Sequence, residues 1–224
     1  MAHHYPLMLV LRDRLCVVVG GGDVAARKVA ALLDCQARVK VIAPAPGPAL
    51  RALAGQCAID LAIREYRGGD LVGAALVFAA TDQPEVNRAV WDEARELGVP
   101  VNAADDPDHC TFTVPAMVRR GPLLVTVSTD GASPALARAI RERLEREYGP
   151  EYGILATWLG ELRGQVKARF PRQNQRERVW QTLLESDVLD CLRAGDEARA
   201  KERLLAVLEQ LSSGLAGPLD GKAE

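Results

Sequence analysis

Histidine, aromatic residues and long apolar runs are scarce in this sequence of 224 residues. The only histidines are His3, His4 and His109, and their spacing does not resemble a zinc site, so no resident metal is expected. Aromatics make up 4% of the chain, so a core must consist mainly of Ala, Val and Leu. The apolar runs are far shorter than the roughly 18 to 20 residues that cross a bilayer, which predicts no membrane association.

Cysteine pairs and a strong net charge are also lacking. The number of cysteines is odd, their spacing is wide, and no C-x-x-C pair or signal peptide is evident; they are Cys16, Cys35, Cys57, Cys110 and Cys191. This pattern favours free thiols in a reducing cytoplasm. The net charge of -2 gives no indication of a nucleic-acid partner.

The first half of the sequence alternates short apolar runs with amphipathic segments. Such alternation predicts an α/β fold with a Rossmann-type parallel sheet. In this arrangement Gly20, Pro44, Thr81 and Asp105 follow strand ends on the ligand edge of the sheet. The expected strands are 15–19, 39–44, 59–66, 76–82 and 99–105, and the expected helices are 24–37, 46–57 and 84–97.

The second half predicts a different architecture. The runs 112–118 and 123–129 are expected to form paired strands, followed by a helix with Ser133 as its N-cap and Pro134 as its first residue. Further helices are expected at 150–168, 174–193 and 196–213, forming a small all-helical domain. We therefore predict a Rossmann domain at 1–113, a connecting segment at 114–147 and a helical domain at 148–224.

The segment from Gly20 to Ala25 fits the dinucleotide pattern G-x-G-x-x-A, directly after a strand and before a helix. Gly20 allows the tight turn, Gly22 lets the backbone approach a pyrophosphate, and Ala25 lets the helix pack closely. The alternative is a glycine turn without a ligand. The ribose-binding carboxylate expected about 20 residues later is absent from Val41–Pro44, and no basic residue replaces it, so this position does not decide between NAD and NADP.

Several segments together resemble one family. They are LRDRLCVVVGGGDVAARK, FAATD with Asn87, VNAADDPDHCTFTVPA and VTVSTDGASPALAR. This combination is similar to precorrin-2 dehydrogenase, the dehydrogenase and ferrochelatase module of sirohaem synthase, and the resemblance covers about Tyr5 to Leu211. It implies NAD-dependent oxidation of precorrin-2 to sirohydrochlorin in sirohaem biosynthesis, an oxidoreductase activity. Some members also insert ferrous iron as lyases, and the family implies a homodimer with residues 114–147 as its dimerisation segment.

The resemblance also implies roles for individual residues. The family's functional aspartate corresponds to Asp105, which the sequence independently places on the ligand edge; the alternative is that Asp105 or Asp106 caps a turn before Pro107. Asp82 has the alternative of capping the next helix. The implied cofactor-binding residues are Gly20, Gly21, Gly22, Asp23 and Val24 for the pyrophosphate, Pro44 and Ala45 for adenosine, and Thr81 and Asp82 for the nicotinamide ribose.

The implied substrate carries eight carboxylates and needs cations. Between Arg138 and Arg178 the sequence has ten basic and six acidic residues, and arginine binds carboxylates in a bidentate manner. The candidate substrate-binding residues are Asn102, Ser128, Ser133, Arg138 and Arg141; the alternative for the arginines is an ordinary solvated helix surface. Asp130 stands where the family has Gly. His109 and Cys110 could assist a metal or simply belong to a loop.

A rival hypothesis from another class is an NAD-sensing regulatory module without catalysis. It explains the glycine loop. It does not explain the arginine-rich helical segment or the segments that resemble sirohaem enzymes.

Overall fold

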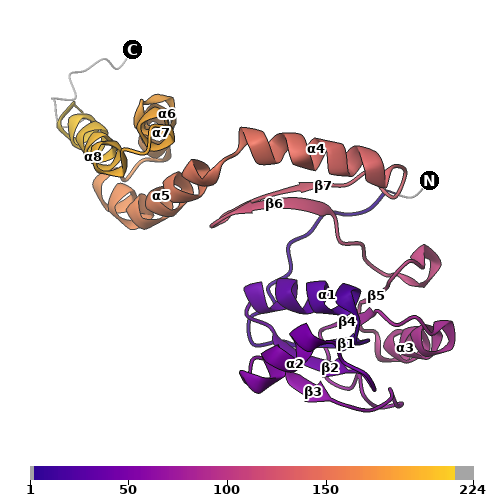
Figure 1. Cartoon of the computed structure of the whole chain (residues 1–224). Helices are drawn as coiled ribbons and strands as arrows, with labels where there is room; N and C mark the ends of the chain where they lie inside the picture. Colours follow the sequence, from indigo (N-terminus) through magenta and orange to yellow (C-terminus); the bar gives the residue numbers. More distant parts are fainter. Residues whose placement is uncertain (1–2, 215–224) are drawn as a thin grey trace. The chain divides into compact units, whose positions relative to one another are not determined.

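The computed structural model describes residues 3–214, which form two compact units divided between Val114 and Pro115 (Figure 1). The boundary lies one residue beyond the end predicted for the Rossmann domain. The further division predicted at residue 147 stays a prediction, because the second unit is not divided there into separate compact parts.

The first unit contains a parallel sheet in the order β3-β2-β1-β4-β5. The order reverses between β1 and β4, and ligands of such sheets bind in the crevice at this switch point, beyond the carboxyl ends of the strands. This topology confirms the predicted Rossmann-type fold. The strands are β1 (Leu15–Val19), β2 (Arg38–Ile42), β3 (Asp60–Ala62), β4 (Leu76–Ala79) and β5 (Val101–Ala103).

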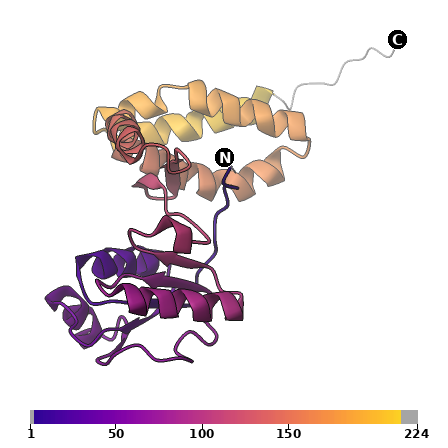
Figure 2. The same cartoon turned by 90° about the vertical axis from the view of Figure 1, so that its right-hand side faces the viewer.

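Helices cover both faces of the sheet (Figures 1 and 2). The core on one face joins Val18 and Phe78 with α1 (Asp23–Asp34) and α2 (Pro48–Gly55). Alternate strand residues pack on the other face against α3 (Pro84–Leu97), which ends at Gly98 in the left-handed conformation. Burial on both faces explains why the strands read as continuous apolar runs.

The connection between β3 and β4 is fastened by an almost buried carboxylate. Asp70 is 9% exposed and accepts two hydrogen bonds from Arg64, at 2.6 and 2.7 Å, and one from Lys40 at 3.2 Å. These cations hold the pKa of Asp70 well below its ordinary value, with the Arg64 hydrogen bond as the main cause. The predicted strand 59–66 is therefore shorter than expected, because residues from Ile63 onward leave the sheet for this connection.

The second unit begins with an antiparallel hairpin of β6 (Ala116–Arg120) and β7 (Leu123–Val127). Its turn is Gly121–Pro122, where Gly121 has a φ of +53°. The hairpin packs against α4 (Pro134–Glu147), as Figure 1 shows. The Oγ of Ser133 accepts a hydrogen bond from the N–H of Leu136 at 3.2 Å, which confirms the predicted N-cap.

Further helices complete the part of the second unit that the structure describes, up to residue 214 (Figure 2). They are α5 (Pro150–Arg169), α6 (Gln173–Glu185), α7 (Val188–Arg193) and α8 (Glu197–Gly214). The single helix predicted at 174–193 is wrong, since Ser186 is extended and its hydroxyl bonds the Leu183 carbonyl at 2.7 Å, ending α6. Within residues 3–214 no helix is both long and apolar enough to span a membrane.

Candidate functional site

Two glycines of the loop after β1 are required by close backbone packing. Gly20 has a φ of +136°, and a Cβ at this residue would lie 2.1 Å from the Ala80 carbonyl oxygen. A Cβ on Gly21 would lie 2.6 Å from the Ala45 carbonyl oxygen. The loop therefore fits between the ends of β2 and β4 only without side chains at these positions.

Gly22 differs from its neighbours because its surroundings are open. A Cβ on Gly22 would meet nothing within 4 Å, and its backbone is extended. Gly22 is the N-cap of α1, and no side chain caps this end of the helix. The first helical bond joins the N–H of Ala26 to the Gly22 carbonyl, so the N–H groups of Asp23 and Val24 remain available to an anion. The loop therefore fits a pyrophosphate.

The turn after β2 lies against the glycine loop. The N–H of Gly47 donates to the Gly21 carbonyl at 2.9 Å, while Pro44 and Ala45 are exposed beside this contact. Sequence reasoning missed Arg51 on α2, whose Nε donates to the Pro46 carbonyl at 2.8 Å. A guanidinium thus stands at the turn where the adenosine ribose is expected.

The end of β4 is held by a side-chain amide. The Oδ1 of Asn87 accepts from the hydroxyl of Thr81 at 2.8 Å, and its Nδ2 donates to the Thr81 carbonyl at 3.0 Å. The N-cap of α3 is Gln83, so the alternative that Asp82 caps this helix is wrong. Asp82 is exposed in the turn between β4 and α3.

Asp105 follows β5 with a backbone that non-glycine residues adopt rarely. Its φ is +59°, in the left-handed region. The preceding Ala104 donates its N–H to the Ala79 carbonyl of β4 at 2.8 Å, which keeps the turn against the sheet edge. Among residues 3–214 no group pairs with the exposed Asp105 carboxylate, so this side chain caps no turn.

A chain of polar contacts fixes the loop that follows Asp105. The Nδ1 of His109 lies 2.6 Å from Asp106 Oδ2, and its Nε2 lies 2.8 Å from a guanidinium nitrogen of Arg88. Because the guanidinium only donates, Nε2 accepts and the Nδ1 proton points to Asp106. The ring also meets the edge of Trp91, with centroids 5.4 Å apart. His109 therefore holds the loop onto α3.

Asn102 and Cys110 add a second fastening to the same loop. The Asn102 amide donates to Cys110 Sγ at 3.4 Å and to the Phe112 carbonyl at 3.1 Å. Cys110 Sγ also lies 3.3 Å from both the N and the O of Ala103, and burial raises the pKa of this thiol. The structure thus makes Asn102 an anchor of the Asp105 loop. Within the described part of the chain no three His, Cys, Asp or Glu side chains are arranged to hold a metal ion.

The other predicted substrate-binding residues lie in the second unit, around the start of α4. Ser133 uses its hydroxyl as the N-cap, and Ser128 Oγ accepts from the N–H of Asp130 at 3.2 Å. Arg138 pairs with Glu142 at 3.1 Å and Arg141 pairs with Glu145 at 2.6 Å. These i,i+4 pairs are characteristic of a solvated helix, although surface pairs of this kind are weak and exchangeable.

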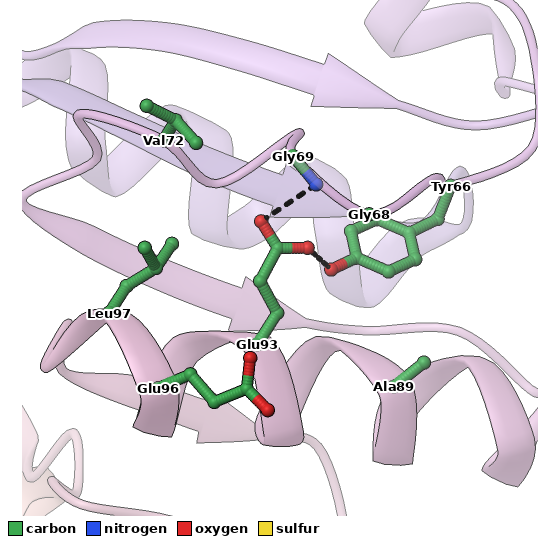
Figure 3. Close-up of a pocket in the computed structure, with 8 residues that line it drawn as sticks. All are labelled: Tyr66, Gly68, Gly69, Val72, Ala89, Glu93, Glu96 and Leu97. Atoms are coloured by element: carbon green, nitrogen blue, oxygen red, sulfur yellow. Dashed lines mark hydrogen bonds between the residues drawn. The ribbon is translucent and has the colours of Figure 1, made fainter.

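A shallow cavity of about 380 Å³ lies along α3, from Ala89 to Leu97 (Figure 3). The Glu93 carboxylate points to its wall, where it accepts hydrogen bonds from the Tyr66 hydroxyl and the N–H groups of Gly69 and Leu71. Its lining comes from the chain before β4 and from α3 residues up to Leu97, away from the carboxyl ends of the strands. The carboxylate therefore serves to anchor the β3–β4 connection.

Comparison with known proteins gives three family models that follow one another along the chain. Residues 7–116 match "Putative NAD(P)-binding", 120–147 match "Sirohaem biosynthesis protein central" and 151–208 match "Sirohaem synthase dimerisation region". The last match lies beyond the segment 114–147 that the sequence analysis assigned to dimerisation.

Relatives and a solved structure agree with these models. The siroheme synthase of Thioalkalivibrio sulfidiphilus is 43% identical over 205 residues, which are 92% of this chain and 42% of the relative. That of Methylobacillus flagellatus is 41% identical over 91% of this chain and 44% of the relative. The chain thus spans less than half the length of these relatives. The structure of "SirC, precorrin-2 dehydrogenase" covers 92% of this chain and 100% of that one, with a TM-score of 0.74 and 24% identity, and shows the same fold.

Proposed function

We propose that this chain, which belongs to the sirohaem synthase family, oxidises precorrin-2 to sirohydrochlorin with NAD as hydride acceptor. The observation that carries the proposal is the exposed carboxylate of Asp105, which no group within residues 3–214 pairs with and which follows β5 on the sheet edge that also bears the open glycine loop. A regulatory NAD-binding module has no need of such a carboxylate.

The glycine loop would hold the cofactor. The N–H groups of Asp23 and Val24 bind the pyrophosphate, with Gly20, Gly21 and Gly22 shaping the loop. Pro44 and Ala45 lie on the adenosine side, while Thr81 and Asp82 extend toward the nicotinamide ribose. NAD, when bound, supplies the acceptor for two electrons and one hydrogen. Arg51 offers a partner for a 2′-phosphate, so NADP is a competing cofactor.

Asp105 would act as the base of this oxidation. The substrate loses a hydride from carbon and a proton from the macrocycle, giving sirohydrochlorin, NADH and one proton. An ionised carboxylate within hydrogen-bond reach can take that proton. Hydrogen bonds hold the loop from Asp106 to Phe112 and so keep Asp105 in its left-handed conformation. The carboxylate therefore has its position at the sheet edge before substrate binds.

Ferrous iron is proposed as a second co-substrate, in a lyase reaction that converts sirohydrochlorin to sirohaem. Two pyrrole protons must leave as the metal enters, and Asp105 is the group suited to accept them. Asn102, Ser128, Ser133, Arg138 and Arg141 are proposed to contact the carboxylate arms of the tetrapyrrole. For the two arginines this requires that they exchange their glutamate partners for substrate.

We further propose a homodimer in the cytoplasm. Leu136 and Ile140, four residues apart on one face of α4, are 53% and 38% exposed, and Met117 on β6 is 38% exposed. Large apolar side chains exposed in this way favour burial against a second copy. The five cysteines are all unpaired, as suits a reducing compartment.

Anaerobic incubation of the protein with precorrin-2 and NAD tests the proposal. We expect NADH and the sirohydrochlorin spectrum to form together in equal amounts. Asp105→Asn serves as the control for background oxidation. Tight NAD binding by wild-type protein without turnover would instead support the regulatory alternative.

A further inference from the structure

Lys28 is a half-buried cation that the sequence analysis did not single out. It lies on the second turn of α1, and its Nζ is 5.1 Å from the centroid of the Phe78 ring. Phe78 pairs in register with Asn102 of β5, and its ring meets Phe112 edge-on at 5.4 Å. The ammonium group therefore lies over β4, at the ring of Phe78, which itself contacts Phe112 in the loop that follows Asp105.

No carboxylate within residues 3–214 forms an ion pair with Lys28. Burial lowers the pKa of its ammonium, and the neighbouring Arg27 lowers it further, while Cys110 and Asp105 act in the opposite direction. The aromatic ring compensates only part of the lost hydration, since a single ring is a weak partner for a cation. The charge of Asp105 thus acts on the Lys28 ammonium, which donates no side-chain hydrogen bond within residues 3–214.

We propose that Lys28 binds one acetate or propionate arm of the tetrapyrrole and so orients the macrocycle against Asp105. This inference rests on the proposed function. The ammonium of Lys28 lies over the Phe78 ring, and that ring packs edge-to-face with Phe112, so the ammonium has a defined position for a carboxylate. Lys28 lies in the first unit with Asp105, and therefore its position relative to that residue is set by the Rossmann core itself.

The test compares three variants on the full chain. Lys28→Met keeps an unbranched stem over Phe78 and removes the charge, whereas Lys28→Arg keeps the charge. Arg27→Ala is the matched control, because it removes an exposed cation from the adjacent position of the same helix. For each variant the KM and kcat for precorrin-2, the NAD affinity and the affinity for sirohydrochlorin are measured.

We expect Lys28→Met to raise the KM for precorrin-2 and weaken sirohydrochlorin binding by about tenfold, with kcat changed less than about twofold. NAD affinity should stay unchanged, Lys28→Arg should recover most of the loss, and Arg27→Ala should behave as wild type.

Two results would overturn the role of Lys28. Unchanged KM and sirohydrochlorin affinity in Lys28→Met, with only a lower melting temperature, would leave the cation–π contact as its whole function. A fall in kcat at constant KM would mean that Lys28 acts on the reacting groups and not on an arm. Failure of the proposed function is distinguishable, because then the wild type would not reduce NAD, while the sirohydrochlorin titration would still report on Lys28.

Discussion

A Cβ on Gly20 would lie 2.1 Å from the carbonyl oxygen of Ala80, whereas a Cβ on Gly22 would meet nothing within 4 Å. The two outer glycines of one motif thus have different tasks. Gly20 lets β1 and β4 end side by side, and Gly22 leaves space for a ligand.

This difference predicts that Gly22→Asp folds normally and loses NAD binding. Gly22 has an extended backbone that any residue adopts, so the fold tolerates a side chain, while a carboxylate there repels the pyrophosphate. Calorimetric titration with NAD is the measurement. Gly20→Ala is the comparison, and it should lose stability because φ is +136° and the Ala80 backbone blocks the new atom. A folded Gly22→Asp protein with wild-type NAD affinity would refute the loop assignment.

Gly153 and Gly160 on α5 are a second pair of glycines, and replacing them by alanine is expected to have opposite effects on stability. A Cβ on Gly153 would lie 2.8 Å from the backbone of Arg120 at the hairpin turn, whereas one on Gly160 of the same helix would meet nothing. We expect Gly153→Ala to lower the free energy of unfolding by about 1–3 kcal/mol, as for other overpacked sites. Gly160→Ala should raise it by about 0.5–1 kcal/mol through helix propensity. Urea denaturation measures both, and equal effects at the two positions would contradict the packing.

The Asp70 cluster predicts a specific loss of stability in acid. Because Arg64 and Lys40 depress the pKa of Asp70 in the folded state, its stabilising contribution is present above the ordinary pKa of 3.8 and is lost as the pH falls below it. Asp70→Asn should cost about 1–3 kcal/mol at neutral pH, and the difference from wild type should shrink in acid. Asp60→Asn, at an exposed position of β3, is the control. A pH-independent difference would show that the charge of Asp70 is not involved.

The proposed dimer has two candidate interfaces, and substitutions of exposed leucines can distinguish them. Light scattering should give about twice the chain mass of 24.2 kDa. If the interface uses α4, Leu136→Glu should produce a monomer; if it uses the region 151–208, Leu184→Glu on α6 should do so, since Leu184 is 60% exposed. A wild-type monomer at all concentrations would exclude both.

The positions of the sheet-edge residues could be predicted because the carboxyl ends of parallel strands share one edge. Gly20, Thr81 and Asp105 follow this rule. The contacts of the Asp105 loop could not be predicted, because His109 meets Arg88, a residue 21 positions away whose approach depends on how α3 packs. The break at Ser186 was missed for a local reason: neither Gly nor Pro marks it.

Lys28 shows another limit of the sequence. An exposed lysine on an amphipathic helix is ordinary, and only the packing of Phe112 on Phe78 reveals that this one is half-buried beside the Asp105 loop. The ion pairs of the α4 arginines, in contrast, can be predicted from the sequence, because their glutamate partners lie four residues further along the same helix.

The role of Asp105 is tested most directly by the dehydrogenation rate of Asp105→Ala, measured with precorrin-2 and saturating NAD. We predict a loss of at least about 10²-fold with unchanged NAD affinity, because Asp105 is the proposed base while the proposed pyrophosphate site lies at the glycine loop. Loss of iron insertion in the same variant would mean that one carboxylate serves both reactions. Near-normal turnover with a melting temperature below that of wild type would contradict the catalytic role of Asp105.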